Sequence, residues 1–412
     1  RCKHPFYDRD SIILLGEHVT LEAGTGCVHT APGHGHDDYE LALKEGLEVY
    51  NPVDNHGKYL STVEFFGGQQ VFAANQSVID KLTEVGALLL TSKISHSYPH
   101  CWRCKKPIIF RATEQWFISM KANDLRKKAL EAIDQVQWIP KWGRERIYGM
   151  IENRPDWCVS RQRSWGVPIT AFSCTACGEY IADGNLMDHV ANIFKEHSSD
   201  VWFDWSAEQL LPAGTKCPKC GAASFEKEND ILDVWFDSGV SHAAVLEANP
   251  KLSSPADLYL EGSDQHRGWF HSSLLESVGS RGVAPYKGVL THGFVLDGKG
   301  HKMSKSMGNV VAPEDVIKKF GADVLRLWCS AQDYRDDTRI SEEILTRVSE
   351  AYRRIRNTCR YILGSIGDFD PATQAVNHAD MQEIDRWALH QLELLKEKVL
   401  SAYNELAFHA IY

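Results

Sequence analysis

The sequence predicts an α/β protein built on a parallel sheet, and three observations support this fold class. Short apolar runs at residues 231–236, 258–260 and 289–292 alternate with helical segments such as 269–278, the order found in parallel sheets. A polar stretch at 173–230, which carries two C-x-x-C pairs, interrupts this order as an insertion would. After residue 341 the pattern is helical to the end. A chain of 412 residues with this organisation predicts two to four domains.

The composition favours a globular protein outside the membrane. Hydrophobic residues make up 43% of the chain and charged residues 24%, and no run of eighteen apolar residues occurs. The start of the chain lacks the apolar core of a signal peptide, so we expect a cytoplasmic location. The net charge of −10 argues against a general polyanion-binding surface. A basic cluster at residues 353–360 has two interpretations, a local RNA contact or a solvated helix face.

Local patterns predict the individual elements in order. Residues 12–15, 19–21 and 26–29 are expected to form short strands, followed by a helix at 37–45 that starts with two aspartates and stops at a glycine. Helices are predicted at 121–135 and 143–153, then a strand and turn at 159–169. Apolar residues at helical spacing predict a further helix at 384–407.

The strongest chemical signal is the loop Lys302-Met303-Ser304-Lys305-Ser306, which glycines flank on both sides. Two lysines and two hydroxyl groups on such a loop can close on a polyphosphate. When a carboxylate attacks the α-phosphate of ATP, negative charge builds on the phosphorus and on the departing pyrophosphate. Mobile cations that engage mainly in the transition state lower that barrier. The alternative interpretation is a Lys/Ser-rich surface turn.

This loop is identical to the signature loop of the class I aminoacyl-tRNA synthetases, and the surrounding blocks resemble their isoleucine/leucine/valine subgroup. Residues 156–166, DWCVSRQRSWG, are similar to a block of that subgroup. The blocks DVWFDSG at 233–239, LEGSDQHRGWF at 260–270 and LTHGF at 290–294 resemble the isoleucyl branch most closely. The resemblance covers essentially the whole chain. It implies ATP-dependent activation of isoleucine, with Mg²⁺, and transfer to tRNA(Ile) by a monomeric enzyme.

Polar residues that follow an apolar strand suggest where the substrates bind. Glu261, Asp264 and Gln265 come just after the apolar run at 258–260, at the strand edge where open α/β sheets bind ligands. The resemblance implies that Glu261 contacts the aminoacyl-adenylate, that His292 and Gly293 approach the adenine or ribose, and that Lys305 binds ATP phosphate with support from Lys302. It further implies that the pocket is lined by Gly262, Asp264, Gln265 and Trp269. For Trp269, core packing is the alternative.

The segment GTGCVHTAPGHGHDDY at residues 24–39 combines glycines with closely spaced His and Asp. Taken alone, this pattern suits a small polar pocket, a metal site or a hydrolytic site. It resembles a signature of the editing domain of the subgroup, which implies that Asp38 holds the α-amino group of a misacylated residue and that His29 lies nearby. Editing meets a physical need, because one methylene distinguishes isoleucine from valine by only about 1–3 kcal/mol.

Six of the eleven cysteines form three C-x-x-C pairs. Without a secretion signal, metal binding is favoured over disulfides. Two such pairs can give tetrahedral zinc coordination by four thiolates, and we predict this site at Cys174, Cys177, Cys217 and Cys220. The third pair, Cys101 and Cys104, has no second pair left within the chain. In the resembling family this pair can bind metal together with a C-x-x-C that lies earlier, which would leave a half-site here.

The resemblance divides the chain into three regions. Residues 1–120 would be the C-terminal part of a β-rich editing domain, and residues 341–412 the start of a helical anticodon-binding domain. Between them, residues 121–340 would be the second half of a Rossmann-like catalytic domain, with a zinc-knuckle insertion at 170–230 and the lysine loop region at 295–340. The family's H-I-G-H motif and a threonine-rich editing stretch are absent. We therefore expect an internal fragment that cannot aminoacylate tRNA by itself. The alternatives are a valyl or leucyl enzyme, or a stand-alone RNA-binding or editing module.

Overall fold

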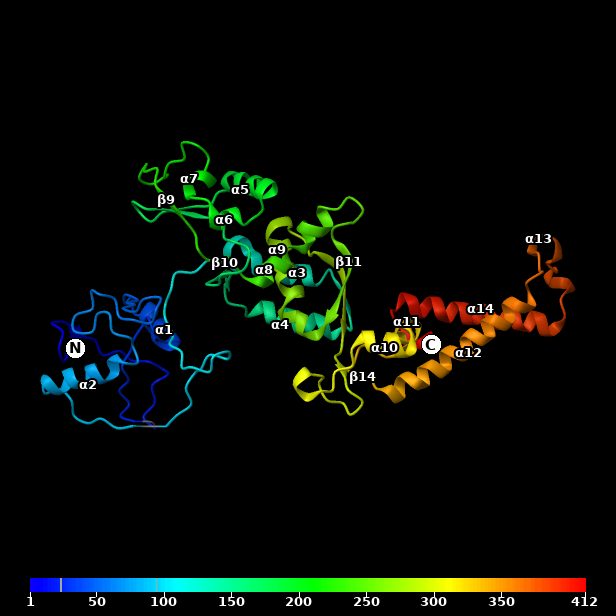
Figure 1. Cartoon of the computed structure of the whole chain (residues 1–412), viewed down its shortest axis with the longest axis horizontal. Coiled ribbons are helices and arrows are strands. Elements are labelled where there is room, and N and C mark those ends of the chain that lie inside the picture. The colour runs from blue at the N-terminus through cyan, green and yellow to red at the C-terminus, as the bar shows by residue number, and fades with distance from the viewer. Residues whose placement is uncertain (23, 94) are drawn as a thin grey trace. The chain divides into compact units, whose positions relative to one another are not determined.

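The computed structural model describes residues 1–22, 24–93 and 95–412. They form two compact units, Arg1–Gln115 and Trp116–Tyr412 (Figure 1). The domain boundaries expected from the sequence stay predictions. None of the helices within the described residues is both long enough and apolar enough to cross a membrane.

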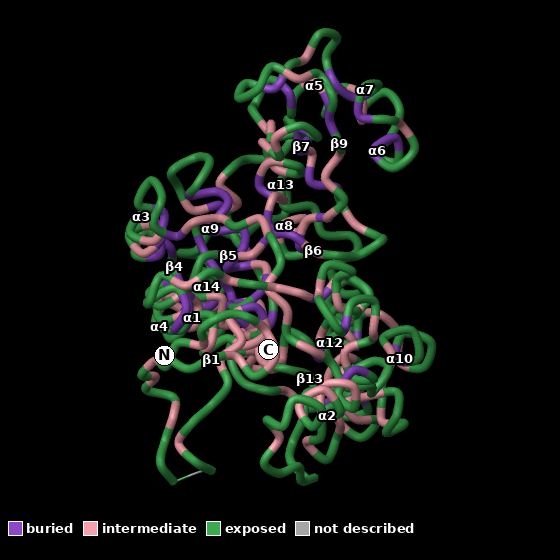
Figure 2. Tube along the Cα trace, turned by 90° about the vertical axis from the view of Figure 1, so that its left-hand side faces the viewer, coloured by how far each residue is buried: buried purple, intermediate pink, exposed green. Residues whose placement is uncertain are grey.

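The first unit contains little regular structure. Its strands β1 (Cys2–Lys3) and β2 (Asp10–Ser11) form an antiparallel pair, and its helices are α1 (His36–Lys44) and α2 (Ala74–Glu84). The helix expected at 37–45 is thus confirmed. The strands expected at 12–15, 19–21 and 26–29 are wrong, because these residues are not in strands. A strand needs a neighbour for its backbone groups, and the side chains of Leu15 and Leu21 are 93% and 90% exposed instead of covered. Figure 2 shows that the residues of α2 and β1 in this unit are mostly exposed or of intermediate burial.

A parallel sheet forms the centre of the second unit and confirms the predicted fold class. Its order is β11 (Ala256–Gly262), β12 (Tyr286–His292) and β4 (Gln137–Ile139), with β12 in the middle. The register pairs Gly262 with His292, so the carboxyl ends of β11 and β12 lie level. The apolar runs at 258–260 and 289–292 are inside these strands, as predicted. The run at 231–236 does not join this sheet, because Ile231–Leu232 pair with another strand in antiparallel orientation and Val234–Gly239 form a helix.

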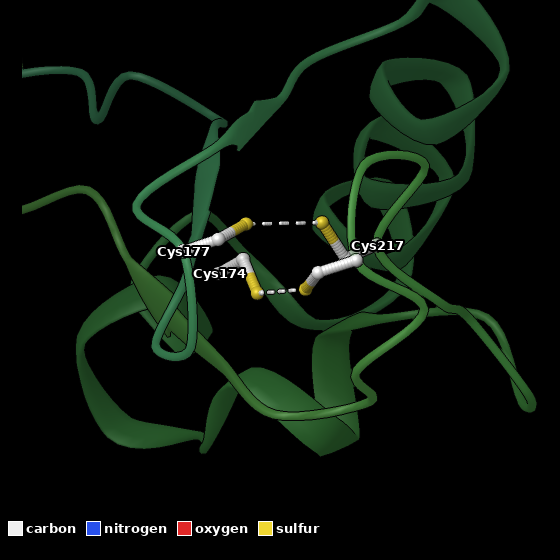
Figure 3. A group of neighbouring side chains, drawn as sticks. Cys174, Cys177 and Cys217 are labelled. Carbon is white, nitrogen blue, oxygen red and sulfur yellow. Dashed lines mark hydrogen bonds between the residues drawn. The ribbon is translucent and has the colours of Figure 1, made fainter.

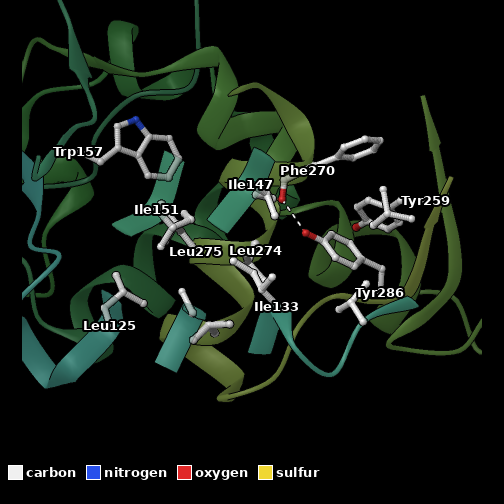
Figure 4. Close-up of a cluster of buried hydrophobic side chains, with 14 of the residues drawn as sticks. Leu125, Ile133, Ile147, Ile151, Trp157, Tyr259, Phe270, Leu274, Leu275 and Tyr286 are labelled. Carbon is white, nitrogen blue, oxygen red and sulfur yellow. Dashed lines mark hydrogen bonds between the residues drawn. The ribbon is translucent and has the colours of Figure 1, made fainter. Parts of the chain in front are cut away.

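Helices on the sheet bury the main hydrophobic core. The connection from β11 to β12 passes through a 3₁₀ turn (Ser263–Arg267) and α9 (Trp269–Arg281), and α9 also packs against α3 (Leu125–Ile133) and α8 (Val234–Gly239). Helix α4 (Trp142–Glu152) contacts α3 and β4. Leu274 and Ile147 are fully buried in this core, where the Tyr286 hydroxyl donates a hydrogen bond to the Phe270 carbonyl oxygen at 3.0 Å (Figure 4). The helices predicted at 121–135, 143–153 and 269–278 are therefore present.

The cysteine-rich insertion has a separate small core. Strands β7 (Phe172–Cys174), β8 (Tyr180–Ile181) and β9 (Phe225–Lys227) form an antiparallel sheet with β7 in the middle. Helices α5 (Gly184–His197), α6 (Val201–Asp204) and α7 (Ala207–Leu210) accompany it. Buried Phe172, Trp202 and Leu210 belong to a hydrophobic cluster of the insertion alone.

The end of the chain is helical, as predicted after residue 341. A parallel pair, β13 (Val295–Leu296) with β14 (Thr338–Arg339), precedes it. The helices are α10 (Pro313–Phe320), α11 (Ala322–Ala331), α12 (Glu342–Ser365), α13 (Pro371–Gln374) and α14 (Glu383–Asn404). The remaining short elements of the second unit are β3 (Phe117–Ile118), β5 (Trp157–Cys158), β6 (Ser160–Arg161), β10 (Ile231–Leu232), a π-helix (His242–Glu247) and 3₁₀ turns at Ala122–Asp124, Lys305–Met307, His378–Asp380 and Phe408–Ala410.

Candidate functional site

The level ends of β11 and β12 bring several predicted site residues together. A Cβ atom added at Gly262 would lie 2.8 Å from Asp264 Oδ1 and 3.7 Å from His292 Cε1, so both side chains approach this strand end. The Glu261 side chain is exposed next to them and has no ion-pair partner among the described residues. A carboxylate and an imidazole at one strand edge suit an ammonium and the hydroxyl groups of a nucleotide.

Gln265 and Trp269 follow on the same connection but have structural contacts of their own. The Gln265 Oε1 accepts a hydrogen bond from the Trp269 backbone N–H at 3.0 Å, and its Nε2 donates to Asp264 Oδ2 at 3.1 Å. The Trp269 ring stacks on Tyr259 with a centroid distance of 4.0 Å, and its Nε1 donates to Ser241 Oγ at 2.9 Å. The structure therefore gives Trp269 a packing role, and its predicted role in the pocket stays a prediction.

The residues just after β12 are held by a segment that our sequence analysis did not identify. The Gly293 N–H donates to the Tyr334 carbonyl oxygen at 2.8 Å, and the Phe294 N–H donates to Asp337 Oδ1 at 2.7 Å. A Cβ atom at Gly293 would lie 2.4 Å from the Asp336 carbonyl oxygen. The Tyr334 hydroxyl also donates to the Leu406 carbonyl oxygen at 2.7 Å, in the helical region. No sequence motif marks this clamp, which brings together residues about 40 positions apart.

An Asp–Asn pair closes the base of the lysine loop. The Asn309 Nδ2 donates to Asp297 Oδ2 at 2.9 Å and to the Lys302 carbonyl oxygen at 3.2 Å, while Asn309 Oδ1 accepts from the Ser304 N–H at 2.9 Å. The amide of Asn309, followed by the backbone N–H of His301, holds the pKa of Asp297 down at about 2. This ring of contacts fixes both ends of the loop.

Among the described residues, the cations of the loop have no protein partner. Neither the Lys302 nor the Lys305 ammonium has a hydrogen-bond or ion-pair partner in the described part of the chain. The Ser304 and Ser306 hydroxyls lie 3.2 Å apart. Met303 packs against the hydrophobic cluster of α10, α11 and α12. The loop is thus anchored by its apolar residue and leaves its charges for a ligand, while a cleft shared with Glu261 stays a prediction.

The four cysteines of the insertion come together as predicted (Figure 3). Their sulfur atoms all lie within 4.8 Å of one another, and the pairs Cys174–Cys220 and Cys177–Cys217 are 3.6 Å apart. A tetrahedral site with Zn–S bonds of about 2.3 Å has S–S edges of roughly 3.8 Å, so the donor set fits zinc.

All three C-x-x-C pairs adopt the same turn. After Cys174, the N–H of residue 178 donates to the cysteine carbonyl and the cysteine N–H donates to residue 179, and the same two bonds follow Cys217 and Cys101. The closing residue has a left-handed backbone each time: Gly178 at φ 72°, Gly221 at φ 75° and Lys105 at φ 59°. Within the described residues, however, only the four-cysteine group contains three or more potential ligands. The second metal site at Cys101 and Cys104 stays a prediction.

The predicted editing residues lie in the first unit without direct contact between them. Asp38, in the first turn of α1, accepts a hydrogen bond from the Ala31 N–H at 3.0 Å through Oδ2 and thereby shapes the glycine-rich turn. A Cβ atom at Gly35 would lie 2.8 Å from the same oxygen. His29 is exposed. The other Asp38 oxygen has no hydrogen bond in the described structure and remains open to a ligand.

The parallel sheet carries polar residues at its carboxyl edge, and the loop with two lysines follows β13. The family model described as "tRNA synthetases class I (I, L, M and V)" matches residues 25–341, and the chain belongs to this family. The isoleucine–tRNA ligase of Geobacter sulfurreducens is 73% identical over 412 residues, which are 100% of this chain and 45% of that protein. The ligase of the same name from Syntrophotalea carbinolica is 69% identical, with coverage of 100% and 44%.

The chain thus spans less than half the length of these curated relatives. Among solved structures, a Mycobacterium tuberculosis methionyl-tRNA synthetase bound by methionyl-adenylate aligns with a TM-score of 0.48 and 17% identity, over 76% of this chain and 52% of that chain. An alignment this distant adds nothing to the family assignment.

Proposed function

We propose that this chain supplies the lysine-loop half of an isoleucine–tRNA ligase. The observation that carries the proposal is the 73% identity with such a ligase over the full 412 residues. The paired ends of β11 and β12 and the unpaired lysines of the loop support it, because they offer the groups that amino-acid activation needs. The substrates would be isoleucine, ATP with Mg²⁺ and tRNA(Ile), and the location cytoplasmic.

In the proposed first step, a carboxylate oxygen of isoleucine attacks the α-phosphorus of ATP and pyrophosphate leaves. Lys302 and Lys305 would stabilise the negative charge that builds on the phosphates in the transition state. Glu261, Asp264 and Gln265 would hold the substrate ammonium and ribose, and His292 with Gly293 would border the nucleotide. In the second step a hydroxyl of the tRNA terminus would attack the activated carbonyl, and AMP would leave.

The other predicted sites have supporting roles in this proposal. Asp38, with one free oxygen, would hold the α-amino group of valine on misacylated tRNA, and His29 would lie on the same side of that substrate. Such hydrolysis supplies selectivity that a single methylene cannot give. Zinc held by Cys174, Cys177, Cys217 and Cys220 would stabilise the insertion rather than take part in the chemistry, since four thiolates leave no open coordination position.

A segment exchange tests the proposal. Residues 1–412 would replace the matching segment of the Geobacter sulfurreducens ligase, and ATP–pyrophosphate exchange would be measured with isoleucine, valine and leucine. We expect exchange that is fastest with isoleucine. Lys305→Ala in the chimera should reduce kcat by about 10²-fold or more, as for other lost transition-state contacts, whereas Lys299→Ala should have little effect.

Other outcomes would identify the alternatives. Faster exchange with valine or leucine would contradict isoleucine as the substrate. Hydrolysis of valyl-tRNA(Ile) without any amino-acid-dependent exchange would favour an editing module instead of a ligase. The 412-residue chain by itself serves as the comparison, and we expect no exchange from it because its sequence has no H-I-G-H motif.

A further inference from the structure

A small cavity lined by arginines lies beside the first turn of α9. It has a volume of about 180 Å³, and its walls include Arg154, Arg161, Arg267, Asp233 and His271. These residues come from the end of α4, from β6, from the start of α8 and from both sides of the α9 N-terminus. None of the strand-end or lysine-loop residues lines it. We call it the arginine pocket.

The pocket carries uncompensated positive charge. Arg161 pairs with Asp233, its Nη2 lying 2.7 Å from Asp233 Oδ2. Arg154 and Arg267 form no ion pair within the described residues, so three guanidinium groups face one carboxylate. Two further acids, Asp237 and Glu276, interact electrostatically with Asp233 of the pocket wall. Burial raises the pKa of both, that of Glu276 to about 9, so Glu276 is protonated near neutral pH and does not balance the arginines.

A buried histidine in the pocket wall lacks a partner. His271 is 3% exposed, and neither its Nδ1 nor its Nε2 has a hydrogen bond among the described residues. The Nε of Arg154 is likewise buried and unpaired. Buried polar groups are nearly always hydrogen-bonded in folded proteins, so unpaired donors that converge on one cavity point to a missing acceptor. Burial, followed by the charges of Arg154 and Arg267, lowers the pKa of His271 to about 3, so it is a neutral N–H donor.

The α9 N-terminus adds to the preference for an anion. This helix has 13 residues, and the Gln265 side chain already accepts the hydrogen bond of its first N–H, that of Trp269. Its first turn provides His271 and Ser272 to the pocket wall. The partial positive charge of the helix N-terminus favours an oxyanion in that position.

We propose that the arginine pocket binds a phosphate group. Two unpaired guanidinium groups, a neutral imidazole donor and a helix N-terminus match the charge and the oxygen acceptors of phosphate. The cavity of about 180 Å³ has room for one tetrahedral oxyanion. The phosphate could come from an RNA backbone or from free inorganic phosphate. This site goes beyond the proposed ligase reaction, which uses none of its residues.

Binding of inorganic phosphate to the 412-residue chain tests the proposal without any measurement of catalysis. Isothermal titration calorimetry would give the stoichiometry and affinity. Phenylglyoxal labelling with peptide mass spectrometry would show which arginines phosphate protects. We expect one phosphate per chain and protection of Arg267. Arg267→Gln should weaken binding by at least about tenfold and Arg267→Lys by less. Arg353→Gln, on the exposed face of α12, is the matched control and should bind as the wild type does.

Each other result has a defined meaning. Competition by a short oligoribonucleotide ending in CCA would assign the phosphate to RNA, and binding without such competition would assign it to free phosphate. Wild-type affinity in Arg267→Gln, or labelling of Arg267 that phosphate does not slow, would overturn the proposal. So would binding of acetate in preference to phosphate, which would indicate that the pocket takes a protein carboxylate. If Arg267→Gln does not fold, the protection result on the wild type decides.

Discussion

The Asp297–Asn309 contact is a single hydrogen bond that holds the lysine loop closed at its base. Because the pKa of Asp297 is depressed to about 2, its ionised form contributes to the folded loop above about pH 4, and this contribution is lost as the pH falls through 2. Asn309→Ala removes the amide that contributes most to this shift. We expect the pKa of Asp297 to rise toward its ordinary value, as followed by a ¹³C NMR titration of the carboxyl group.

A separate exposed Asn–Asp pair provides the control for that titration. The Asn377 amide lies 3.4 Å from Asp380 Oδ2 in a separate part of the helical region. Asn377→Ala should leave the Asp297 titration unchanged. An unaltered Asp297 titration in Asn309→Ala would show that the amide does not hold the carboxylate.

Glu276 makes stability depend on pH in the opposite sense. Its carboxyl is buried without a partner, and its pKa is raised to about 9, whereas the unfolded chain releases this proton near pH 4.5. The folded state therefore binds more protons, and stability falls as the pH rises from about 4.5 to 9. Glu276→Gln imitates the protonated form. Relative to the wild type, it should gain on the order of 1–3 kcal/mol between pH 6 and pH 9 in urea unfolding. A difference that does not vary with pH would contradict this.

The two knuckle turns of the insertion form an element whose stability depends on the metal. We expect one zinc per chain by elemental analysis, and chelation should unfold residues 172–227 while the parallel sheet persists. Structural zinc contributes on the order of 10 kcal/mol to the folding free energy of small domains. Cys217→Ser removes one of the four thiolate ligands and should abolish zinc binding. Hydrogen exchange within the insertion measures the unfolding.

Substitutions of two other cysteines show whether the loss of zinc is specific to the four-cysteine site. Cys359 is exposed on α12, and Cys359→Ser should keep the full zinc content. Cys101→Ser should keep it as well if Cys101 and Cys104 bind no metal in this chain. Full zinc content in Cys217→Ser would rule out the four-cysteine site.

Helix α9 is the element on which the core of the second unit depends. Leu274 of α9 is fully buried in the hydrophobic core that α9 forms with the neighbouring elements. Leu274→Ala should cost about 2–5 kcal/mol of unfolding free energy, from lost burial and the remaining cavity. Leu394→Ala on α14, where the leucine is 40% exposed, should cost less than about 1 kcal/mol. Equal losses in urea unfolding would contradict the packing described for α9.

At the scale of the whole molecule, the sequence predicted features whose determinants are local. Apolar runs followed by Glu261 and by His292 gave both strand ends, because parallel strands place their carboxyl ends at the same edge. The C-x-x-C spacing gave the four-thiol cluster, and helical periodicity gave α3, α4, α9 and the C-terminal helices.

Features that depend on contacts between distant residues could not be predicted. The arginine pocket joins Arg154, Arg161 and Arg267, which lie in three separate sequence segments and have no common pattern. The clamp of Tyr334 on Gly293 depends on a backbone hydrogen bond between two distant segments, which no local sequence pattern indicates. The strands expected at residues 12–15, 19–21 and 26–29 failed for a related reason. Short apolar runs indicate strand propensity, whereas a strand forms only when another one pairs with it.

The third knuckle has a consequence for protein engineering. Its turn is already closed by backbone bonds, yet Lys105 occupies the left-handed position that glycine fills in the other two. A side chain there stores about 1 kcal/mol of strain. Lys105→Gly should therefore raise the melting temperature slightly instead of lowering it. A metal site made by introducing two further cysteines opposite this turn would use a backbone that already has the knuckle geometry.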